Sequence, residues 1–343
     1  MQVCEFQLLF NGMTDNHPLV SVLMPSYNHE AYVVEAIRSV LVQDYPRIEF
    51  VLIDDGSKDG TWKAAASLRQ ACESRFERVV MRVRENRGTA ATCKELMSEA
   101  RGEFVALLAS DDQFEPGALS RLAGPMIEDP AVGLTVGRNL IMDGEGRMCY
   151  WDKDRNNVYD LSEATYTSFD EFIQFYTHVD FKSSQFGSYA ELTKGNHVPN
   201  GQMIRREVYD LIDPYDSRAP LEDWWLQLQL SKVTRYRYVD APTFRYRWHG
   251  TNTASNAEKM RRMGRATILR ERERLLEKGD VEHLEMLRPN FMIVDDLREI
   301  KWLRRKGVSA RLICIHGFDT VQYRLAWPGK NIKLTPKMRE RTP

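Results

Sequence analysis

A first pair of adjacent acidic residues, Asp54 and Asp55, comes directly after the apolar run Ile48–Ile53. A carboxylate in this position can accept a hydrogen bond from the imide N–H of a uracil or from a ribose hydroxyl. Gly56 follows the pair, and a glycine lets the backbone approach a ligand closely. The alternative is that one of these acids only closes a turn or caps a helix.

A second pair, Asp111 and Asp112, repeats the arrangement after Ser110 and the apolar run Phe104–Ala109. One or two carboxylates, completed by phosphate oxygens of a substrate, are ligands that Mg²⁺ and Mn²⁺ prefer. The alternative role is an Asp cap on a helix that we expect to begin near Pro116, where a missing N–H is harmless. The pattern therefore predicts either a metal site or a helix cap.

The elements that position these acids alternate between strands and helices in the first half of the chain. We expect four strands, at Leu19–Met24, Ile48–Ile53, Val79–Val83 and Phe104–Ala109, with amphipathic helices between them. This alternation predicts crossover connections and a mostly parallel sheet covered by helices on both faces. In such sheets ligands bind beyond the carboxyl ends of the strands, where both acidic pairs lie.

The second half of the chain has a different pattern. Leu134–Met142 and Arg147–Trp151 flank a turn and predict a hairpin. Ser168 and Glu171 have the spacing of a capping box at the start of a short helix. A helix is expected from Pro220 to Ser231, and two half-buried strands of period two follow it. The arginines of those strands, Arg235, Arg237, Arg245 and Arg247, are expected to form a solvated face.

The composition excludes several classes of protein. Of 343 residues, 43% are apolar and 28% charged, which is close to the average of globular proteins and excludes a fibrous or wholly disordered chain. No apolar run approaches the roughly 20 residues of a membrane-spanning helix. The net charge of −1 argues against a dedicated nucleic-acid binder. Five scattered cysteines without a CxxC pair favour a reduced, cytoplasmic setting, and no signal peptide is apparent.

Both ends of the chain differ from its middle. Residues 1–17 have no clear period, and we expect a poorly ordered leader there. Residues 256–343 read as a helical region with interruptions at Gly279, Pro289 and Gly307. This region has 21 Lys and Arg against 12 Asp and Glu, an excess of nine positive charges. A solvated helical bundle is the simplest interpretation, and docking on a membrane surface is the alternative.

An ordered set of motifs carries a resemblance to a known family. In the first half these motifs are Val20-Ser21-Val22-Leu23-Met24-Pro25-Ser26-Tyr27-Asn28, Ala36-Ile37-Arg38-Ser39-Val40, Val51-Leu52-Ile53-Asp54-Asp55-Gly56-Ser57, Glu85-Asn86-Arg87-Gly88 and Ala109-Ser110-Asp111-Asp112. In the second half they are Pro199-Asn200-Gly201, Arg205-Arg206, Glu222-Asp223-Trp224-Trp225 and Tyr246-Arg247-Trp248-His249-Gly250-Thr251-Asn252. Over residues 18–255 the chain resembles the family 2 inverting glycosyltransferases of GT-A fold, in particular bacterial members that build O-antigen or capsule-type surface polysaccharides.

The resemblance implies a role for each residue that matches a family motif. It implies that the nucleotide sugar contacts Pro25, Tyr27, Glu30, Asp54, Asp55, Arg87, Gly88, Ser110 and Asp112. It implies that Asp111 binds Mn²⁺ or Mg²⁺, with His249 beside the metal and the diphosphate, and that Asp223 is the catalytic base. Glu222, Trp224, Trp225 and Arg205 fall on the acceptor or diphosphate side. Of the two tryptophans, we expect one to pack in the core and one to line the acceptor site.

The sequence departs from the family pattern at a few positions. Ala109 stands where many members have the first acid of the Asp-X-Asp signature, which keeps a non-catalytic nucleotide-sugar or glycan-binding relative open as an alternative. His249 has the alternative role of a hydrogen-bonded surface residue. A nucleotide-dependent oxidoreductase would need G-x-G-x-x-G after the first strand, and Pro25-Ser26-Tyr27-Asn28 is there instead.

The function implied by the resemblance is transfer of a sugar, with inversion, from a UDP-sugar or another nucleoside-diphosphate sugar to a glycan or lipid-linked glycan. Such a reaction needs one base, charge stabilisation on the leaving diphosphate and exclusion of water. Asp223 lies in the first turn of the expected helix, where the helix dipole favours a negative charge. We expect a donor half at 18–130, an acceptor half at 131–255, and a cytoplasmic enzyme with contact to the inner membrane face.

Overall fold

The computed structural model describes residues 17–250, 252–291, 311–316 and 321–326. The chain divides into two compact units, Met1–Thr267 and Ile268–Pro343. The expected leader, apart from His17, lies outside the described residues.

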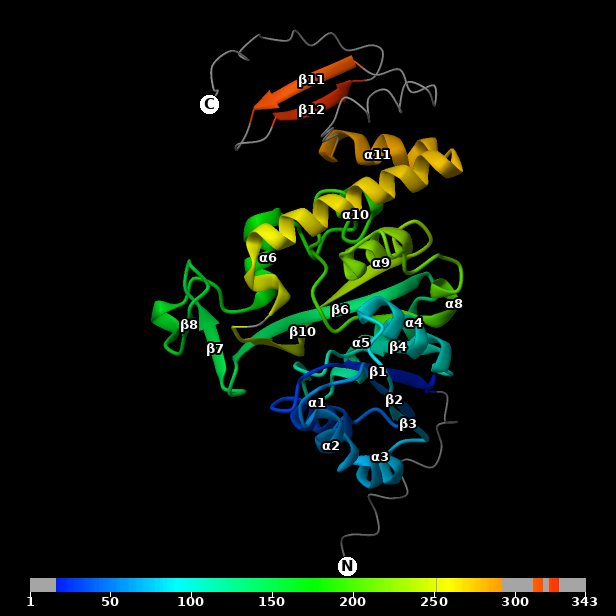
Figure 1. Cartoon of the computed structure of the whole chain (residues 1–343), viewed down its shortest axis with the longest axis vertical. Coiled ribbons are helices and arrows are strands. Elements are labelled where there is room, and N and C mark those ends of the chain that lie inside the picture. Colours follow the sequence, from blue (N-terminus) through cyan, green and yellow to red (C-terminus); the bar gives the residue numbers. More distant parts are fainter. Residues whose placement is uncertain (1–16, 251, 292–310, 317–320, 327–343) are drawn as a thin grey trace, which may run out of the picture. The chain divides into compact units, whose positions relative to one another are not determined.

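The first unit is built on one large sheet (Figure 1). Its strands are β1 (Val20–Ser26), β2 (Ile48–Asp54), β3 (Arg78–Val83), β4 (Phe104–Leu107), β5 (Gln113–Phe114), β6 (Val132–Asp143), β7 (Met148–Trp151), β8 (Asn157–Val158), β9 (Met203–Arg205) and β10 (Arg235–Trp248). The main order is β3-β2-β1-β4-β9-β6-β10-β5. Strands β1 to β4 are parallel, as the sequence predicts, and β9 runs antiparallel between β4 and β6. The fold is therefore α/β with a mostly parallel sheet.

The first-half helices are α1 (Val33–Leu41), α2 (Thr61–Ala66), α3 (Arg69–Arg75), α4 (Thr89–Glu99) and α5 (Ala118–Glu128). All seven residues of β2 are buried, which shows that both faces of the sheet are covered there. Helix α4 packs on β1 and β2, and α5 packs on β6 and β10. The N-cap of α5 is Gly117, so the alternative role of the second acidic pair as an Asp cap on this helix is wrong.

The second half of the sheet is organised by β6 and β10, which run side by side and parallel (Figure 1). The predicted hairpin is confirmed as β6 and β7, and Ser168 caps the predicted helix α6 (Phe169–Thr177). The remaining elements are η1 (Leu161–Glu163), α7 (Tyr189–Leu192), α8 (Arg206–Tyr209), α9 (Glu222–Leu230) and η2 (Thr253–Ser255). The prediction of two strands over 235–248 is wrong, because β10 continues through irregular register steps around Pro242.

Helix α10 (Ala257–Lys278) begins the basic C-terminal region and is followed by α11 (Val281–Phe291). Gly279 separates the two helices with a left-handed φ of 68°, as its type predicts. The predicted break at Pro289 is wrong, since α11 continues to Phe291. The region is not wholly helical either, because β11 (Arg311–His316) and β12 (Val321–Ala326) form an antiparallel pair. Gly307, another predicted stop, lies outside the described residues. None of the helices among the described residues is long and apolar enough to cross a membrane.

Candidate active site

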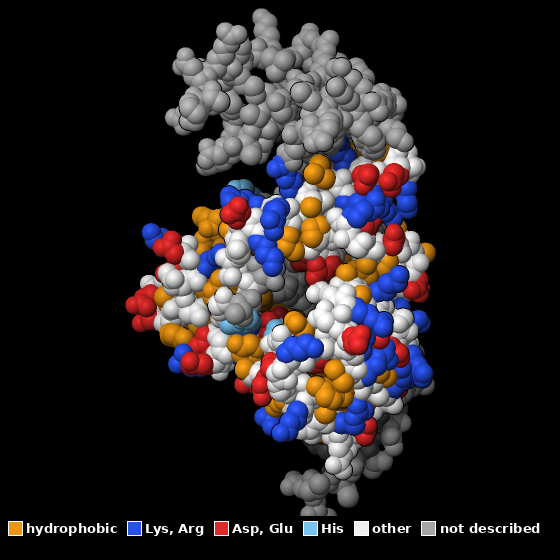
Figure 2. Space-filling model, viewed as in Figure 1, with side chains coloured by type: hydrophobic (Ala, Val, Ile, Leu, Met, Phe, Trp, Pro, Cys, Tyr) orange, Lys and Arg blue, Asp and Glu red, His pale blue; other side chains and the backbone are white. Residues whose placement is uncertain are grey.

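The carboxyl ends of β1, β2, β4, β6 and β10 lie at one edge of the sheet, because these strands share one direction. This edge carries the loop after Ser26, both acidic pairs, and Asp143 and His249. Figure 2 shows histidine and acidic side chains gathered beside a hollow on the face it presents. The strand directions thus bring together groups that are distant in the sequence, from the loop after Ser26 to His249.

Asp54 is fully buried and both of its carboxylate oxygens bind Ser57. One oxygen accepts from the backbone N–H at 2.7 Å and the other from the hydroxyl at 2.7 Å. This is the turn role that the sequence left open. The geometry therefore gives Asp54 the task of shaping the loop after β2.

Asp55 holds a second loop, the one that contains Arg87 and Gly88. Its carboxylate accepts the backbone N–H of Arg87 at 2.8 Å and of Gly88 at 2.9 Å, and it pairs with Arg84. Gly88 has a φ of 85°, which a glycine adopts without strain. The carboxylate of Asp55 thus fixes the position of this loop beside the edge of the sheet.

The loop after β1 presents one exposed aromatic ring, Tyr27, whose side chain is 42% exposed. Pro25 is half-buried at the end of β1. Glu30 is exposed and accepts the backbone N–H of Gly60 at 2.9 Å. The structure therefore places Tyr27 where it can contact a ligand, whereas the carboxylate of Glu30 is bound to the neighbouring loop.

Asp111 is the centre of a cluster with two histidines. Its Oδ2 lies 3.3 Å from Nε2 of His249 and 3.8 Å from Nε2 of His29. Nδ1 of His29 lies 2.8 Å from the hydroxyl of Ser110, which orients the ring. Burial raises the pKa of the Asp111 carboxyl, but the hydrogen bond from His249 and the charge of His29 outweigh it, so the pKa is below its ordinary value.

This cluster fits a divalent cation. A carboxylate oxygen and an imidazole nitrogen, completed by phosphate oxygens of a substrate, are suitable ligands for an ion such as Mn²⁺. Among the residues that the structure describes, no group of three or more His, Cys, Asp or Glu side chains has metal-binding geometry. Asp111 and His249 are the residues of this chain that would hold such an ion.

Asp112 differs from its neighbour. Its side chain is buried and accepts the backbone N–H of Arg247 at 2.8 Å. Burial and the charge of Asp111 together raise the pKa of Asp112 well above its ordinary value. The two adjacent acids therefore have opposite tendencies, and Asp111 is the one whose surroundings favour the charged form.

Arg247 is buried inside the site, so its predicted place on a solvated strand face is wrong. Its Nη2 donates to Oε2 of Glu35 at 2.6 Å, and its Nε donates to the carbonyl oxygen of Asp111 at 2.6 Å. The guanidinium also lies over the ring of Tyr32, 4.8 Å from the ring centre. The same ring stacks on His249 at 5.1 Å. Arg247 thus connects α1, the loop of Asp111 and the end of β10.

Asp223 stands at the start of α9 and is exposed. Its Oδ2 accepts from the side-chain amide of Asn196 at 2.8 Å. Burial raises the pKa of the Tyr246 hydroxyl, and the charges of Asp112, Asp111 and Asp223 raise it further. The charges of Asp223 and of the acidic pair after β4 thus act on the same tyrosine hydroxyl.

Glu222, beside Asp223, is half-buried. Burial and the charge of Asp223 raise the pKa of Glu222 to about 7.

Three residues predicted on the acceptor or diphosphate side have structural roles instead. Trp224 and Trp225 are both buried, and their indole N–H groups donate to the carbonyl oxygens of Leu192 at 2.9 Å and Asp213 at 3.1 Å. The prediction that one of them lines the acceptor site is therefore wrong. Arg205 pairs in register with Phe104 at the amino end of β4, away from the edge that carries the site. It lies there because β9 is antiparallel to β4.

Comparison with known proteins agrees with this fold. Residues 21–186 match the model of the family described as glycosyl transferase family 2. This stretch of the chain is a family 2 glycosyltransferase domain. TuaG of Bacillus subtilis (strain 168), named for teichuronic acid biosynthesis, is 38% identical over 117 residues, which are 34% of this chain and 45% of TuaG. Chondroitin synthase of Escherichia coli is 23% identical over 238 residues, which are 69% of this chain and 30% of that protein.

A solved structure shows the same fold. The structure of residues 1–349 of TarS from S. aureus, in complex with UDP-GlcNAc, aligns with a TM-score of 0.50 and 20% sequence identity. The alignment covers 73% of this chain and 66% of the TarS chain. The fold is therefore GT-A. The chain spans less than half the length of TuaG and of chondroitin synthase.

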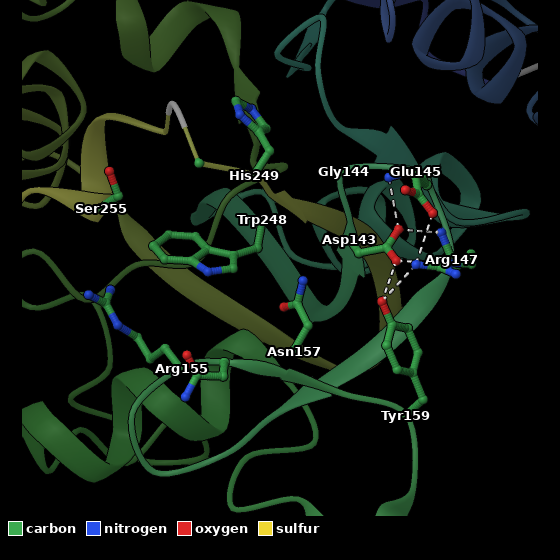
Figure 3. Close-up of a pocket in the computed structure, with 12 residues that line it drawn as sticks. Asp143, Gly144, Glu145, Arg147, Arg155, Asn157, Tyr159, Trp248, His249 and Ser255 are labelled. Carbon is green, nitrogen blue, oxygen red and sulfur yellow. Dashed lines mark hydrogen bonds and ion pairs between the residues drawn. The ribbon is translucent and has the colours of Figure 1, made fainter.

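Sequence reasoning missed several residues of the site. His29 follows the motif that ends at Asn28, and its potential as a ligand was the available signal. Tyr32 and Glu35 lie on the helix face that packs toward Arg247, and no local pattern marks them. Figure 3 shows His249 beside a cavity. Other residues that line this cavity were also missed by sequence reasoning.

Proposed function

We propose that the chain is a metal-dependent, inverting glycosyltransferase of polysaccharide biosynthesis. It moves a sugar, of the hexosyl or N-acetylhexosaminyl class, from a UDP-sugar to a hydroxyl of a glycan or lipid-linked glycan. The names of TuaG and chondroitin synthase, together with the UDP-GlcNAc bound by TarS, support this choice. Residues 18–255 form the proposed catalytic domain, with 18–130 holding the donor and 131–255 the acceptor. The proposed setting is the cytoplasm.

The observation that supports the proposal best is the Asp111 cluster at the carboxyl edge of the sheet. The oxygen of Asp111 is shared by two imidazole nitrogens, at 3.3 Å and 3.8 Å. A bound divalent cation, held by Asp111 and His249, would neutralise charge on the leaving diphosphate. Tyr27 offers a face for the base, and the loops that Asp54 and Asp55 shape form the wall beside it.

Asp223 is the proposed general base. Its carboxylate is exposed, so an acceptor hydroxyl can reach it, and Asn196 fixes its direction through Oδ2. Proton transfer to this carboxylate leaves the hydroxyl oxygen free to attack the anomeric carbon. Inversion needs this single base and no nucleophile from the enzyme, unlike the two-carboxylate mechanism of retaining hydrolases.

Titration calorimetry with UDP, in the presence and absence of Mn²⁺, tests the donor side of the proposal. We expect Mn²⁺ to strengthen UDP binding, and Asp111→Asn to weaken the metal-dependent part at least about tenfold. Asp129→Asn removes a surface carboxylate that pairs with Arg235 and is the matched control. Wild-type protein that does not bind UDP would contradict the proposal. Donor binding without any turnover would favour the non-catalytic relative that Ala109 leaves open.

A further inference from the structure

A cavity of about 500 Å³ lies beside His249, on the side of the hairpin of β6 and β7 (Figure 3). Its size lies within the range of pockets that hold small ligands, about 300–1,000 Å³. The lining combines aromatic rings with polar groups: Arg147, Arg155, Asn157, Tyr159, Trp248 and His249. A flat aromatic face with convergent hydrogen-bonding groups suits a sugar ring, which has apolar C–H faces and polar edges.

The two arginines of this cavity differ in their hydrogen-bond and ion-pair partners. Arg147 is paired with Asp143 at 2.8 Å and with Glu145 at 2.9 Å, and it donates to the hydroxyl of Tyr159 at 3.0 Å. The guanidinium of Arg155 lies 4.9 Å from the ring centre of Trp248 and 5.4 Å from that of Phe172. Among the residues that the structure describes, Arg155 has no carboxylate partner. Its donors are therefore available to a ligand.

The loop that carries Arg155 is held in place. Trp151 and Asn157 pair across β7 and β8, and the loop between them is closed by Asp152. One oxygen of Asp152 accepts the backbone N–H groups of Asp154 and Asn156 at 2.8 Å each. Arg155 itself has a φ of 64°, which is uncommon for a residue with a side chain. The guanidinium is thus presented by a closed hairpin loop.

The cavity is joined to the reaction centre through two residues. His249 lines the cavity and is hydrogen-bonded to Asp111. The positive charge of Arg155 also acts on Tyr246, the same tyrosine on which Asp111 and Asp223 act. A ligand in the cavity would therefore lie next to His249, one of the two proposed metal ligands.

We propose that this cavity holds the acceptor sugar and that Arg155 selects an acceptor with an anionic substituent, a carboxylate or a phosphate. A guanidinium matches either group with two parallel hydrogen bonds, and its cation–π contact with Trp248 holds it beside the cavity. The inference rests on the proposed function, since it takes the ligand of the cavity to be the acceptor.

Ligand-observed NMR titrations on the full chain test this proposal. The probes are methyl β-glucuronide, glycerol 3-phosphate and the neutral methyl β-glucoside, each with saturating UDP and Mn²⁺. We expect at least one anionic probe to bind about 10- to 100-fold more tightly than the glucoside. Arg155→Gln removes this preference, and Arg155→Lys keeps part of it.

Lys153→Gln is the matched control, because Lys153 lies on the same loop and its side chain is 81% exposed. The control keeps the preference of the wild type. Equal affinity of wild-type protein for charged and neutral probes, or a preference that persists in Arg155→Gln, would overturn the inference. UDP binding, measured separately, is expected to be the same in all four proteins. A wild-type protein that does not bind UDP but still prefers anionic probes through Arg155 would overturn the proposed function. The cavity would then remain a site for anionic sugars.

Discussion

Replacing Arg247 by methionine removes the charge that connects three parts of the proposed active site, while it keeps an unbranched side chain of similar length. The guanidinium is 1% exposed and bonds to Glu35 and to the carbonyl oxygen of Asp111 at 2.6 Å each. It also makes two longer contacts, at 3.4 Å, to the carbonyl oxygens of Asp143 and Gly144. The substitution leaves these carbonyl groups without their donor.

The size of the effect follows from the burial of each partner. Breaking a buried ion pair costs about 3–5 kcal/mol when the remaining charge stays buried. The side chain of Glu35 is 45% exposed, so water can solvate it after the loss of Arg247. We therefore expect the free energy of unfolding to fall by about 2–4 kcal/mol. For a unit of this size that corresponds to a melting temperature lower by roughly 4–16 °C.

Thermal unfolding and calorimetric titration with UDP and Mn²⁺ measure the two consequences. Because Arg247 binds the carbonyl oxygen of Asp111 and contacts the Tyr32 ring that stacks on His249, we expect weaker metal-dependent UDP binding as well as lower stability. Arg235→Met is the control, since Arg235 lies on the same strand and its ion pair with Asp129 is exposed, at 63% and 37% for the two side chains. An exposed pair of this kind contributes about 0–1 kcal/mol. If both variants unfolded alike and bound UDP as the wild type does, Arg247 would not organise the site.

Three further predictions concern a loop, a titrating acid and the basic tail. Gly56→Ala places a Cβ 2.9 Å from two backbone atoms of the loop that Asp55 holds, at a φ of 74°, and we expect a cost of about 1–3 kcal/mol and weaker UDP binding by calorimetry. The pKa of Glu222 is raised from 4.5 to about 7, so its contribution to stability is full below pH 4.5 and is lost as the pH rises through 7. Glu222→Gln should flatten the melting temperature between pH 5 and 8, and an unchanged pH profile would contradict this. For residues 256–343 we propose contact with an anionic membrane surface, which predicts co-sedimentation with anionic vesicles that weakens with salt. Co-sedimentation that depends neither on the lipid charge nor on the salt concentration would contradict this proposal and favour a solvated helical bundle.

The elements of the donor half could be predicted from the sequence because they are local. The apolar runs before Asp54 and Asp111 end within two residues of the observed strands β2 and β4. The alternation with helices was enough to place both acidic pairs at one edge of the sheet. These predictions rest on periodicity and on chain direction, which short stretches of sequence contain.

The roles of Arg247, Trp225 and Arg205 could not be predicted in the same way, because each depends on a neighbour distant in the sequence. Arginines that alternate with aromatic residues are typical of a strand with a solvated face. Only the fold shows that Glu35 lies beside Arg247 and pairs with it. Arg205 lies at the amino end of β4, and not at the edge of the sheet that carries the site, because β9 runs antiparallel to β4. Nothing within 203–205 specifies that direction. The closed loop of Arg155 depends in the same way on the pairing of β7 with β8.

The measurement that tests the central claim most directly is release of UDP from a UDP-sugar, in the presence of Mn²⁺, by the wild type and by Asp223→Asn. The amide keeps the size of the side chain but cannot accept a proton at neutral pH. We predict that turnover falls by about 10²–10⁴-fold while the affinity for UDP and the melting temperature stay near those of the wild type. Near-normal turnover by Asp223→Asn, or no release of UDP by the wild type from any UDP-sugar tested with glycan acceptors, would contradict the account.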